Sequence, residues 1–160
     1  MLLHVKGSTK ENRGFIETAA FWYAEKLMGK RLMSGLKINI NLKRGMLEKT
    51  GNEATAIWED DNVRPKEFTI DIDSSANIRN LLITLAHEIV HVKQWAKNEM
   101  YEYTNMAGMV RFKGEKVHME ITEYWDYPWE IEAYGKQLGL FVRMCEASGL
   151  AKREDMKEEA

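Results

Sequence analysis

The chain has 160 residues, of which 44% are hydrophobic and 30% are charged, a balance typical of one soluble globular domain. The formal net charge of −2 argues against a nucleic-acid partner, because such proteins usually carry an excess of Lys and Arg. The single cysteine, Cys145, excludes an intramolecular disulfide and suits a reducing compartment. No signal peptide or membrane span is recognisable, so we expect a cytoplasmic protein with no membrane partner.

The first elements that the sequence predicts are a short strand and a long helix. Leu2 to Val5 can form the strand, and His4 within it is expected at the surface without a metal role. Ser8 followed by Glu11 fits a capping box and predicts a helix from about Lys10 to Met33. The apolar residues of this helix recur at helical spacing and are expected to face the core: Phe15, Ile16, Ala19, Ala20, Tyr23 and Leu27.

A change of the hydrophobic period to two after residue 37 predicts three strands. Apolar and polar residues alternate from Ile38 to Leu42, and the alternation recurs from Glu53 to Glu59 and from Phe68 to Asp73. The polar segment Asp60 to Lys66 separates the last two strands. The third strand either lies at the rim of a cleft, where an extended peptide could pair with its open edge, or is an ordinary covered strand.

The stretch from Asn77 to Lys97 contains the pattern H-E-x-x-H, formed by His87, Glu88 and His91. On a helix, residues four positions apart lie on one face, so both imidazoles can bind one metal ion. Glu88 follows the first histidine and can reach a water molecule at that ion without being a ligand itself. This spacing is the one that zinc hydrolysis requires.

The residues around the pattern predict a largely buried helix. Ser74 or Ser75 is expected to cap it, and Asn98 suits its end. Burying two histidines and a glutamate without a partner is costly, which favours a metal site over a pair of structural histidines. One face of the helix is apolar and another carries the polar residues: Leu81, Leu82, Leu85, Ile89, Val92 and Ala96 against Asn80, Thr84, His87, His91 and Gln94.

Beyond this helix, the sequence predicts an irregular segment from Glu99 to Gly108 and a hairpin from Met109 to His118 that turns at Lys113 to Glu115. Pro128 and Gly149 suit the start and the end of a long final helix. The buried face of that helix is expected to consist of Ile131, Tyr134, Leu138, Phe141, Val142 and Cys145.

A hydrolytic zinc site usually takes three protein ligands, so the third must come from another element. Glu130 and Glu132 are the best candidates, and only one can face the histidines because residues two positions apart on a helix point to opposite sides. We favour Glu130, since the small Ala133 one turn later allows close helix packing, and Glu132 stays open as the alternative. His118 and Asp126 are further candidates, although the hairpin position of His118 favours a surface role.

The segments HEIVHVKQ and PWEIEA together resemble the gluzincin branch of the zincin-like metallopeptidases, in particular small single-domain peptidases that are often carried by phages. The resemblance implies a zinc ion on His87, His91 and Glu130, with Glu88 as the general base. Many gluzincins have Asp or Asn at the position of Tyr134 to support a metal-bound histidine, so this supporting role is unassigned here. The implied fold is α+β and zincin-like, with an N-terminal helix, a twisted sheet of three to four strands, the H-E-x-x-H helix and a C-terminal helix.

We therefore expect residues 1–150 to form one zincin-like peptidase domain and residues 151–160 a charged, frayed tail. The expected reaction is hydrolysis of a peptide bond in a peptide or protein substrate, with Tyr124, Tyr127 or Tyr134 donating to the oxyanion. One rival function is a metal-stabilised binding or regulatory module, against which Glu88 argues because a structural site would not need it. The other is a SprT-like, DNA-associated protease, which the acidic balance disfavours.

Overall fold

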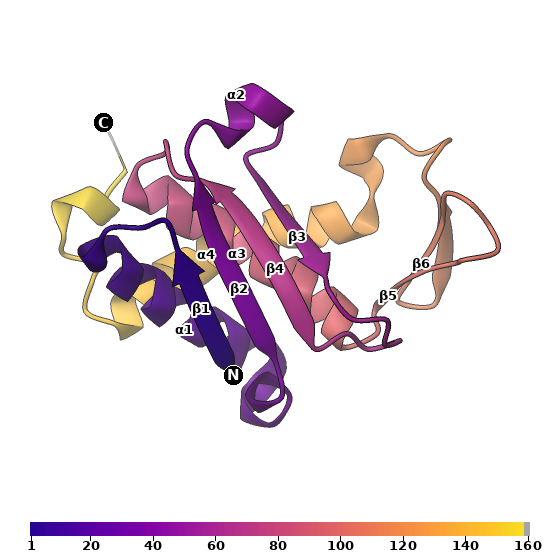
Figure 1. Cartoon of the computed structure of the whole chain (residues 1–160), viewed down its shortest axis with the longest axis horizontal. Coiled ribbons are helices and arrows are strands. Elements are labelled where there is room, and N and C mark those ends of the chain that lie inside the picture. The colour runs from indigo at the N-terminus through magenta and orange to yellow at the C-terminus, as the bar shows by residue number, and fades with distance from the viewer. Residues whose placement is uncertain (159–160) are drawn as a thin grey trace.

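The computed structural model describes residues 1–158, and within them a four-stranded sheet carries the long helices on one face (Figure 1). A smaller, three-stranded sheet lies to one side of this unit. The combination of helices with two small sheets confirms the predicted mixture of α and β structure.

The larger sheet consists of β1 (Leu2–Lys6), β2 (Lys37–Lys43), β3 (Ala54–Trp58) and β4 (Glu67–Asp73), in the spatial order β1-β2-β4-β3. Strands β1, β2 and β4 are parallel, whereas β3 pairs antiparallel with β4. The predicted strands agree with these limits to within two residues. Because β4 is paired on both sides, it is the covered strand of the two alternatives, and the open edge belongs to β3. The short helix α2 (Met46–Thr50), between β2 and β3, was not predicted.

Alternation along the strands gives this sheet one polar and one apolar face. On the polar face, Lys37 pairs with Glu67, and both Asn41 and Lys43 bind Asp71. This face is turned to the viewer in Figure 1, with the helices behind it. The opposite, apolar face lies under the helices and contributes the centre of the core: Val5, Ile38, Ile40, Phe68, Ile70 and Ile72.

Helix α1 (Lys10–Ser34) connects β1 to β2. Its N-cap is Thr9, whose hydroxyl oxygen accepts a hydrogen bond from the backbone N–H of Asn12, so the predicted cap at Ser8 is one residue too early. Near its end, Gly29 interrupts the helix with φ 76° and ψ 161°, a conformation that glycine adopts without a steric penalty. The predicted apolar face is confirmed, since these residues are buried or pack against the core: Phe15, Ile16, Ala19, Ala20, Tyr23 and Leu27.

Helix α3 (Ile78–Ala96) carries the H-E-x-x-H pattern and is buried along most of its length. Its N-cap is Asn77, whose side-chain oxygen accepts a backbone N–H in the first turn. The prediction of Ser74 or Ser75 as the cap is wrong, because both serines lie in the turn that follows β4. The predicted end is confirmed by Asn98, which has φ 55° just after the helix.

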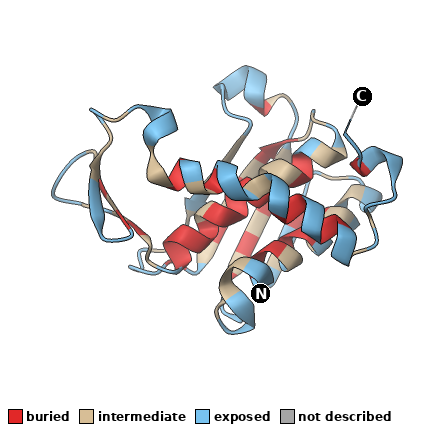
Figure 2. Ribbon diagram, turned by 180° about the vertical axis from the view of Figure 1, so that it is seen from behind, coloured by how far each residue is buried: buried red, intermediate tan, exposed pale blue. Residues whose placement is uncertain are grey.

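Helix α4 (Pro128–Ala147) crosses α3 on the side away from the sheet (Figure 2). Apolar residues surround most of this helix, so their spacing alone does not determine which stripe is buried. The stripe with the small Ala133 faces α3, because it allows the two helices to approach closely. The predicted face is therefore largely wrong, and four of its six residues are exposed: Ile131, Tyr134, Leu138 and Val142. The residues buried in their place, together with the two predicted correctly, are Trp129, Glu130, Ala133, Leu140, Phe141, Met144 and Cys145.

The smaller sheet contains β5 (Met100–Glu102), β6 (Met109–Phe112) and β7 (Glu115–His118), each antiparallel to its neighbour. The predicted hairpin is confirmed, and Lys113 and Gly114 form its two-residue turn with φ 48° and 91°. Strand β5 was missed, because three residues in a polar segment give no periodic signal.

The chain beyond residue 150 folds back onto the helices. The 3₁₀ helix η2 (Glu154–Met156) packs against α3, and Met156 is buried in the core. Arg153 lies 3.2 Å from the carboxylate of Glu11 on α1. Residues 153–156 of the predicted tail thus contact the helices, while residues 159–160 lie outside the described residues. Among residues 1–158, no helix combines the length and the apolar character needed to cross a membrane.

Candidate metal centre

Side chains from α3 and α4 converge beside the open edge of β3. The Nε2 atoms of His87 and His91 on α3 are 3.0 Å apart. Glu130 on α4 places one carboxylate oxygen 3.2 Å from Nε2 of His87 and the other 3.4 Å from Nε2 of His91. The structure thus brings together the three residues predicted as metal ligands, with their ligand atoms within 4.8 Å of one another.

The local sequence explains this convergence. The two histidines are four residues apart on a regular helix and therefore share one face. Pro128 begins α4, which puts Glu130 in the first turn, where the helix dipole stabilises a negative charge. Ala133, with no exposed surface, lies one turn later and lets α4 approach α3 closely.

The separations between the three side chains fit a small tetrahedral cation. An ion bound at about 2.0–2.1 Å to each ligand keeps the ligand atoms about 3.3 Å apart in a tetrahedral arrangement. The observed separations of 3.0, 3.2 and 3.4 Å lie on either side of this value. The residues present therefore fit a metal ion of the size of zinc.

Gln94 fixes the protonation of one of the two histidines. Its side chain has no exposed surface, and its NH₂ group donates to the backbone oxygen of Trp129 at 3.0 Å and to a carboxylate oxygen of Glu132 at 2.9 Å. Because both partners can only accept, Oε1 of Gln94 faces His91 and accepts from its Nδ1 at 2.8 Å. His91 therefore keeps a proton on Nδ1, and its Nε2 faces the site, where it donates a proton to Glu130 or, once deprotonated, offers a lone pair to a metal ion.

Gln137 has the corresponding position at the other histidine. Its Oε1 is 2.9 Å from Nδ1 of His87. Tyr134, for which the sequence left the supporting role open, instead packs its ring against His87 with a centroid distance of 4.6 Å. Sequence reasoning assigned no role to Gln137, although it lies two helical turns after Glu130 and so faces the same way.

The charge of the site is set by its carboxylates. Burial alone would raise the pKa of Glu130, but hydrogen bonds from His87 and His91 outweigh it and hold the pKa at about 2. Burial lowers the pKa of His91, but Glu130 and Glu88 outweigh burial and raise this pKa above its ordinary value. An ionised carboxylate among converging lone pairs thus attracts positive charge, which a proton or a metal ion can supply.

Glu132, the alternative third ligand, points away from the histidines. Its carboxylate binds Nζ of Lys93 at 2.6 Å and Nζ of Lys113 at 3.1 Å, in addition to Gln94. Burial would raise the pKa of Glu132, but these hydrogen bonds lower it to about 2. Within residues 1–158, His118 in β7 and the exposed Asp126 also lie outside the group of converging ligands.

Glu88 lies in the wall of the site without joining the three ligand atoms. It is 6% exposed, and burial raises its pKa above the ordinary value although His91 and His87 act in the opposite direction. A raised pKa brings this carboxyl group closer to the range that suits a general acid and base.

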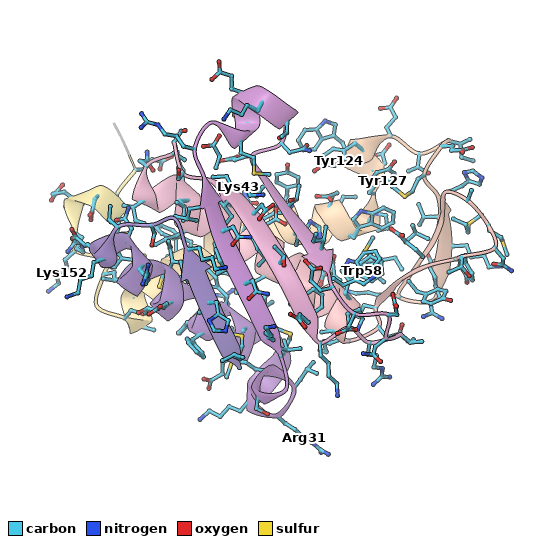
Figure 3. The ribbon with its side chains drawn as sticks, viewed as in Figure 1. Arg31, Lys43, Trp58, Tyr124, Tyr127 and Lys152 are labelled. Carbon is cyan, nitrogen blue, oxygen red and sulfur yellow. The ribbon has the colours of Figure 1, made fainter. Side chains whose placement is uncertain are left out.

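Among the three tyrosines considered as donors, Tyr124 is the best placed. It belongs to the 3₁₀ helix η1 (Tyr124–Asp126), and its hydroxyl donates to a carboxylate oxygen of Glu130 at 3.0 Å. Burial, a hydrogen bond with Tyr134 and the charge of Glu130 raise the pKa of Tyr124, so the hydroxyl stays protonated. Tyr127 lies close to Tyr124 (Figure 3). Its hydroxyl instead donates to the backbone oxygen of Met119, which gives it a structural role.

Two adjoining cavities, of about 390 and 380 Å³, open onto this cluster. Both are lined by His87, Glu88 and Tyr124, so together they form one continuous groove. Residues 54–58, the whole of β3, line the second cavity, which means that the edge of the strand faces it.

Comparisons of the chain with models of protein families, with curated proteins and with solved structures give no match.

Proposed function

We propose that the protein is a zinc-dependent metallopeptidase with a zincin-like fold, of the gluzincin type that its sequence resembles. The observation that carries this proposal is the convergence of His87, His91 and Glu130 next to the buried Glu88 at the wall of an open groove. Two imidazoles and one carboxylate are a set of donors that zinc favours in hydrolytic sites.

The chain supplies groups for each proton transfer in peptide hydrolysis. Zinc held by these three ligands would lower the pKa of a water molecule to about 7 and polarise a carbonyl group. Glu88 takes the proton of the attacking water and passes it to the leaving amine. The protonated hydroxyl of Tyr124 turns from Glu130 toward the carbonyl oxygen and donates to it as negative charge develops.

The open edge of β3 supports an extended peptide as the substrate. Within residues 1–158, β3 is paired only with β4, so the N–H and C=O groups along its other edge are available to a further strand. A peptide that pairs there by backbone hydrogen bonds runs through the groove that contains Glu88 and the histidines.

The proposal is tested by metal analysis and by the substitution Glu88→Gln. Purified protein is expected to contain one zinc ion per chain, as measured by inductively coupled plasma mass spectrometry. It is also expected to cleave casein in a reaction that EDTA stops. Glu88→Gln should keep the zinc and lower the rate of cleavage by about a hundredfold or more, because the general base is lost. The matched control is Glu48→Gln, at an exposed carboxylate of α2, which should change neither property.

Absence of a stoichiometric transition metal would overturn the proposal. Full activity of the Glu88→Gln protein would remove Glu88 from the mechanism. Zinc binding without any cleavage by the unaltered chain would favour the metal-stabilised binding or regulatory module instead.

A further inference from the structure

A third cavity, of about 320 Å³, continues the groove beyond the metal centre. It shares Trp58, Trp95 and Glu102 with the cavity that holds the histidines, so the two are contiguous. The rings of Trp58 and Trp95 pack together with centroids 4.1 Å apart, and Figure 3 shows the Trp58 side chain on the side of β3 that faces the smaller sheet. The remaining apolar wall consists of Val63, Pro65 and Tyr101.

The whole groove, defined as these three cavities, is lined by acidic side chains but, apart from the two histidines, by no basic ones among the described residues. Among residues 1–158, no Lys or Arg lines any of the three cavities, although the chain has 23 Lys and Arg against 25 Asp and Glu. The carboxylates that line the groove are Glu53, Asp61, Glu88, Glu102 and Glu130. Since Glu88 and Glu130 belong to the candidate metal site, the negative charge available to a ligand elsewhere in the groove comes from Glu53, Asp61 and Glu102.

Two of these carboxylates, Asp61 and Glu102, line the third cavity, called the aromatic cavity from here on, and have no part in the proposed metal site. Both are exposed, and within residues 1–158 neither forms an ion pair. An aromatic wall with unpaired carboxylates at its border is suited to a cation, which is attracted both by the ring faces and by the opposite charges. Arginine suits such a site best, since its planar guanidinium stacks on indole rings and binds carboxylates through several N–H groups.

The direction of β3 determines which part of a peptide meets this cavity. The strand runs from Ala54 to Trp58, and antiparallel pairing is slightly more stable per residue than parallel pairing. A peptide in that arrangement has its N-terminal side at Trp58. Glu88 lies further along the groove, in the cavity that Trp58 also borders. Residues before the cleaved bond therefore lie nearest the aromatic cavity.

We propose that this cavity, formed by Trp58, Trp95, Tyr101, Asp61 and Glu102, binds an arginine or lysine side chain of the substrate on the N-terminal side of the cleaved bond. This inference rests on the proposed peptidase function for its account of cleavage. It defines the substrate class as basic peptide segments, and the recognition step itself requires only the groove.

Binding is measured first, because it does not depend on catalysis. Fluorescein-labelled decapeptides of Ala, Ser and Gly that carry one Arg, one Gln or one Glu are titrated with the metal-free chain in EDTA, and fluorescence anisotropy is recorded. The Arg peptide is expected to bind at least about tenfold more tightly than the Gln peptide, and the Glu peptide most weakly. Equal affinities, or no binding of the Arg peptide, would overturn the inference.

Substitutions that remove negative charge then show which residues cause the preference for the Arg peptide. The double substitution Asp61→Asn with Glu102→Gln should abolish the preference for Arg over Gln. Both positions are exposed, so the fold is expected to persist, and an unchanged circular dichroism spectrum checks this. Glu59→Gln is the matched control, because Glu59 is an exposed carboxylate directly after β3 that lines none of the cavities. A preference for Arg that survives the double substitution would overturn the assignment.

Cleavage of the same peptides with zinc separates the two proposals. If the chain cleaves them, kcat/KM should follow the order Arg, Gln, Glu, and mass spectrometry should place the cut C-terminal to the Arg. A cut on the other side of the Arg would overturn the assigned direction. If the Arg peptide binds selectively but no peptide is cut, the peptidase proposal fails and the recognition of basic segments stands.

Discussion

The two histidines of the candidate metal centre contact glutamines in different settings. Gln94 lies in α3 itself, has no exposed surface, and uses both ends of its amide in hydrogen bonds to His91, Glu132 and the backbone of Trp129. Gln137 reaches His87 from α4, is half-buried, and borders the open groove.

The side of the site that contains Gln94 is therefore part of the core, and the side that contains Gln137 is part of the surface. Gln94 links both helices, since its partners Trp129 and Glu132 belong to α4. Its loss should therefore affect the fold as well as metal binding. Gln137 contacts the site at the groove, where water can replace a lost hydrogen bond. Its loss should affect metal binding alone.

The largest effect is expected for Gln94→Leu. The substitution leaves Nδ1 of His91 and the backbone oxygen of Trp129 buried without their partner, which should lower the free energy of unfolding by roughly 2–4 kcal/mol. Zinc affinity should also fall, by about 10–100-fold, because the tautomer of His91 is no longer fixed. Urea unfolding in EDTA measures the first effect, and competition with a fluorescent chelator measures the second. A protein of unchanged stability would show that Gln94 does not hold the two helices together.

A smaller effect is expected from the ion pairs around Glu132 at low pH. The pKa of this carboxyl is about 2 in the folded chain and about 4.3 in an unfolded one. Since the folded-state value is the lower one, the contribution of Glu132 to stability is complete above about pH 4.3 and is lost as the pH falls toward 2. The difference in unfolding free energy between the unaltered chain and Glu132→Gln should therefore shrink between pH 6 and pH 3. A difference that stays constant over this range would contradict the assignment.

The smallest effect is expected for Gln137→Ala. Zinc affinity should fall by about tenfold, at the low end of the range for groups that orient a metal-bound histidine. The free energy of unfolding in EDTA should change by less than about 0.5 kcal/mol, because the side chain borders the groove. A loss of stability as large as that of Gln94→Leu would remove the contrast between the two glutamines.

Much of the fold could be predicted because its elements have clear local signals. The period of two in β2, β3 and β4, the Lys113-Gly114 turn and the position of Pro128 each determine structure over a few residues. The buried face of α4 could not be predicted in the same way. Ile131 and Leu138 are as apolar as Phe141, and only the packing of α4 on α3 decides that they face solvent.

In the candidate metal centre, too, some residues could be predicted from local sequence and others depend on how the helices pack. His87 and His91 follow from spacing within one helix, whereas the choice of Glu130 over Glu132 depends on how α4 is rotated about its axis. The same rotation places the Glu132 carboxylate next to Lys93 and Lys113. Gln94 was predicted on the face that carries the histidines, but neither it nor Gln137 was assigned a supporting role, because a glutamine side chain does not identify its hydrogen-bond partner in a sequence.

The buried side chain of Met156 sets a practical limit for preparing this protein. It fills part of the core next to α3, and Arg153 adds an ion pair to α1. A shortened chain that stops at residue 150 would leave an empty space over the helix that bears both histidines. Recombinant versions should therefore retain residues 151–156.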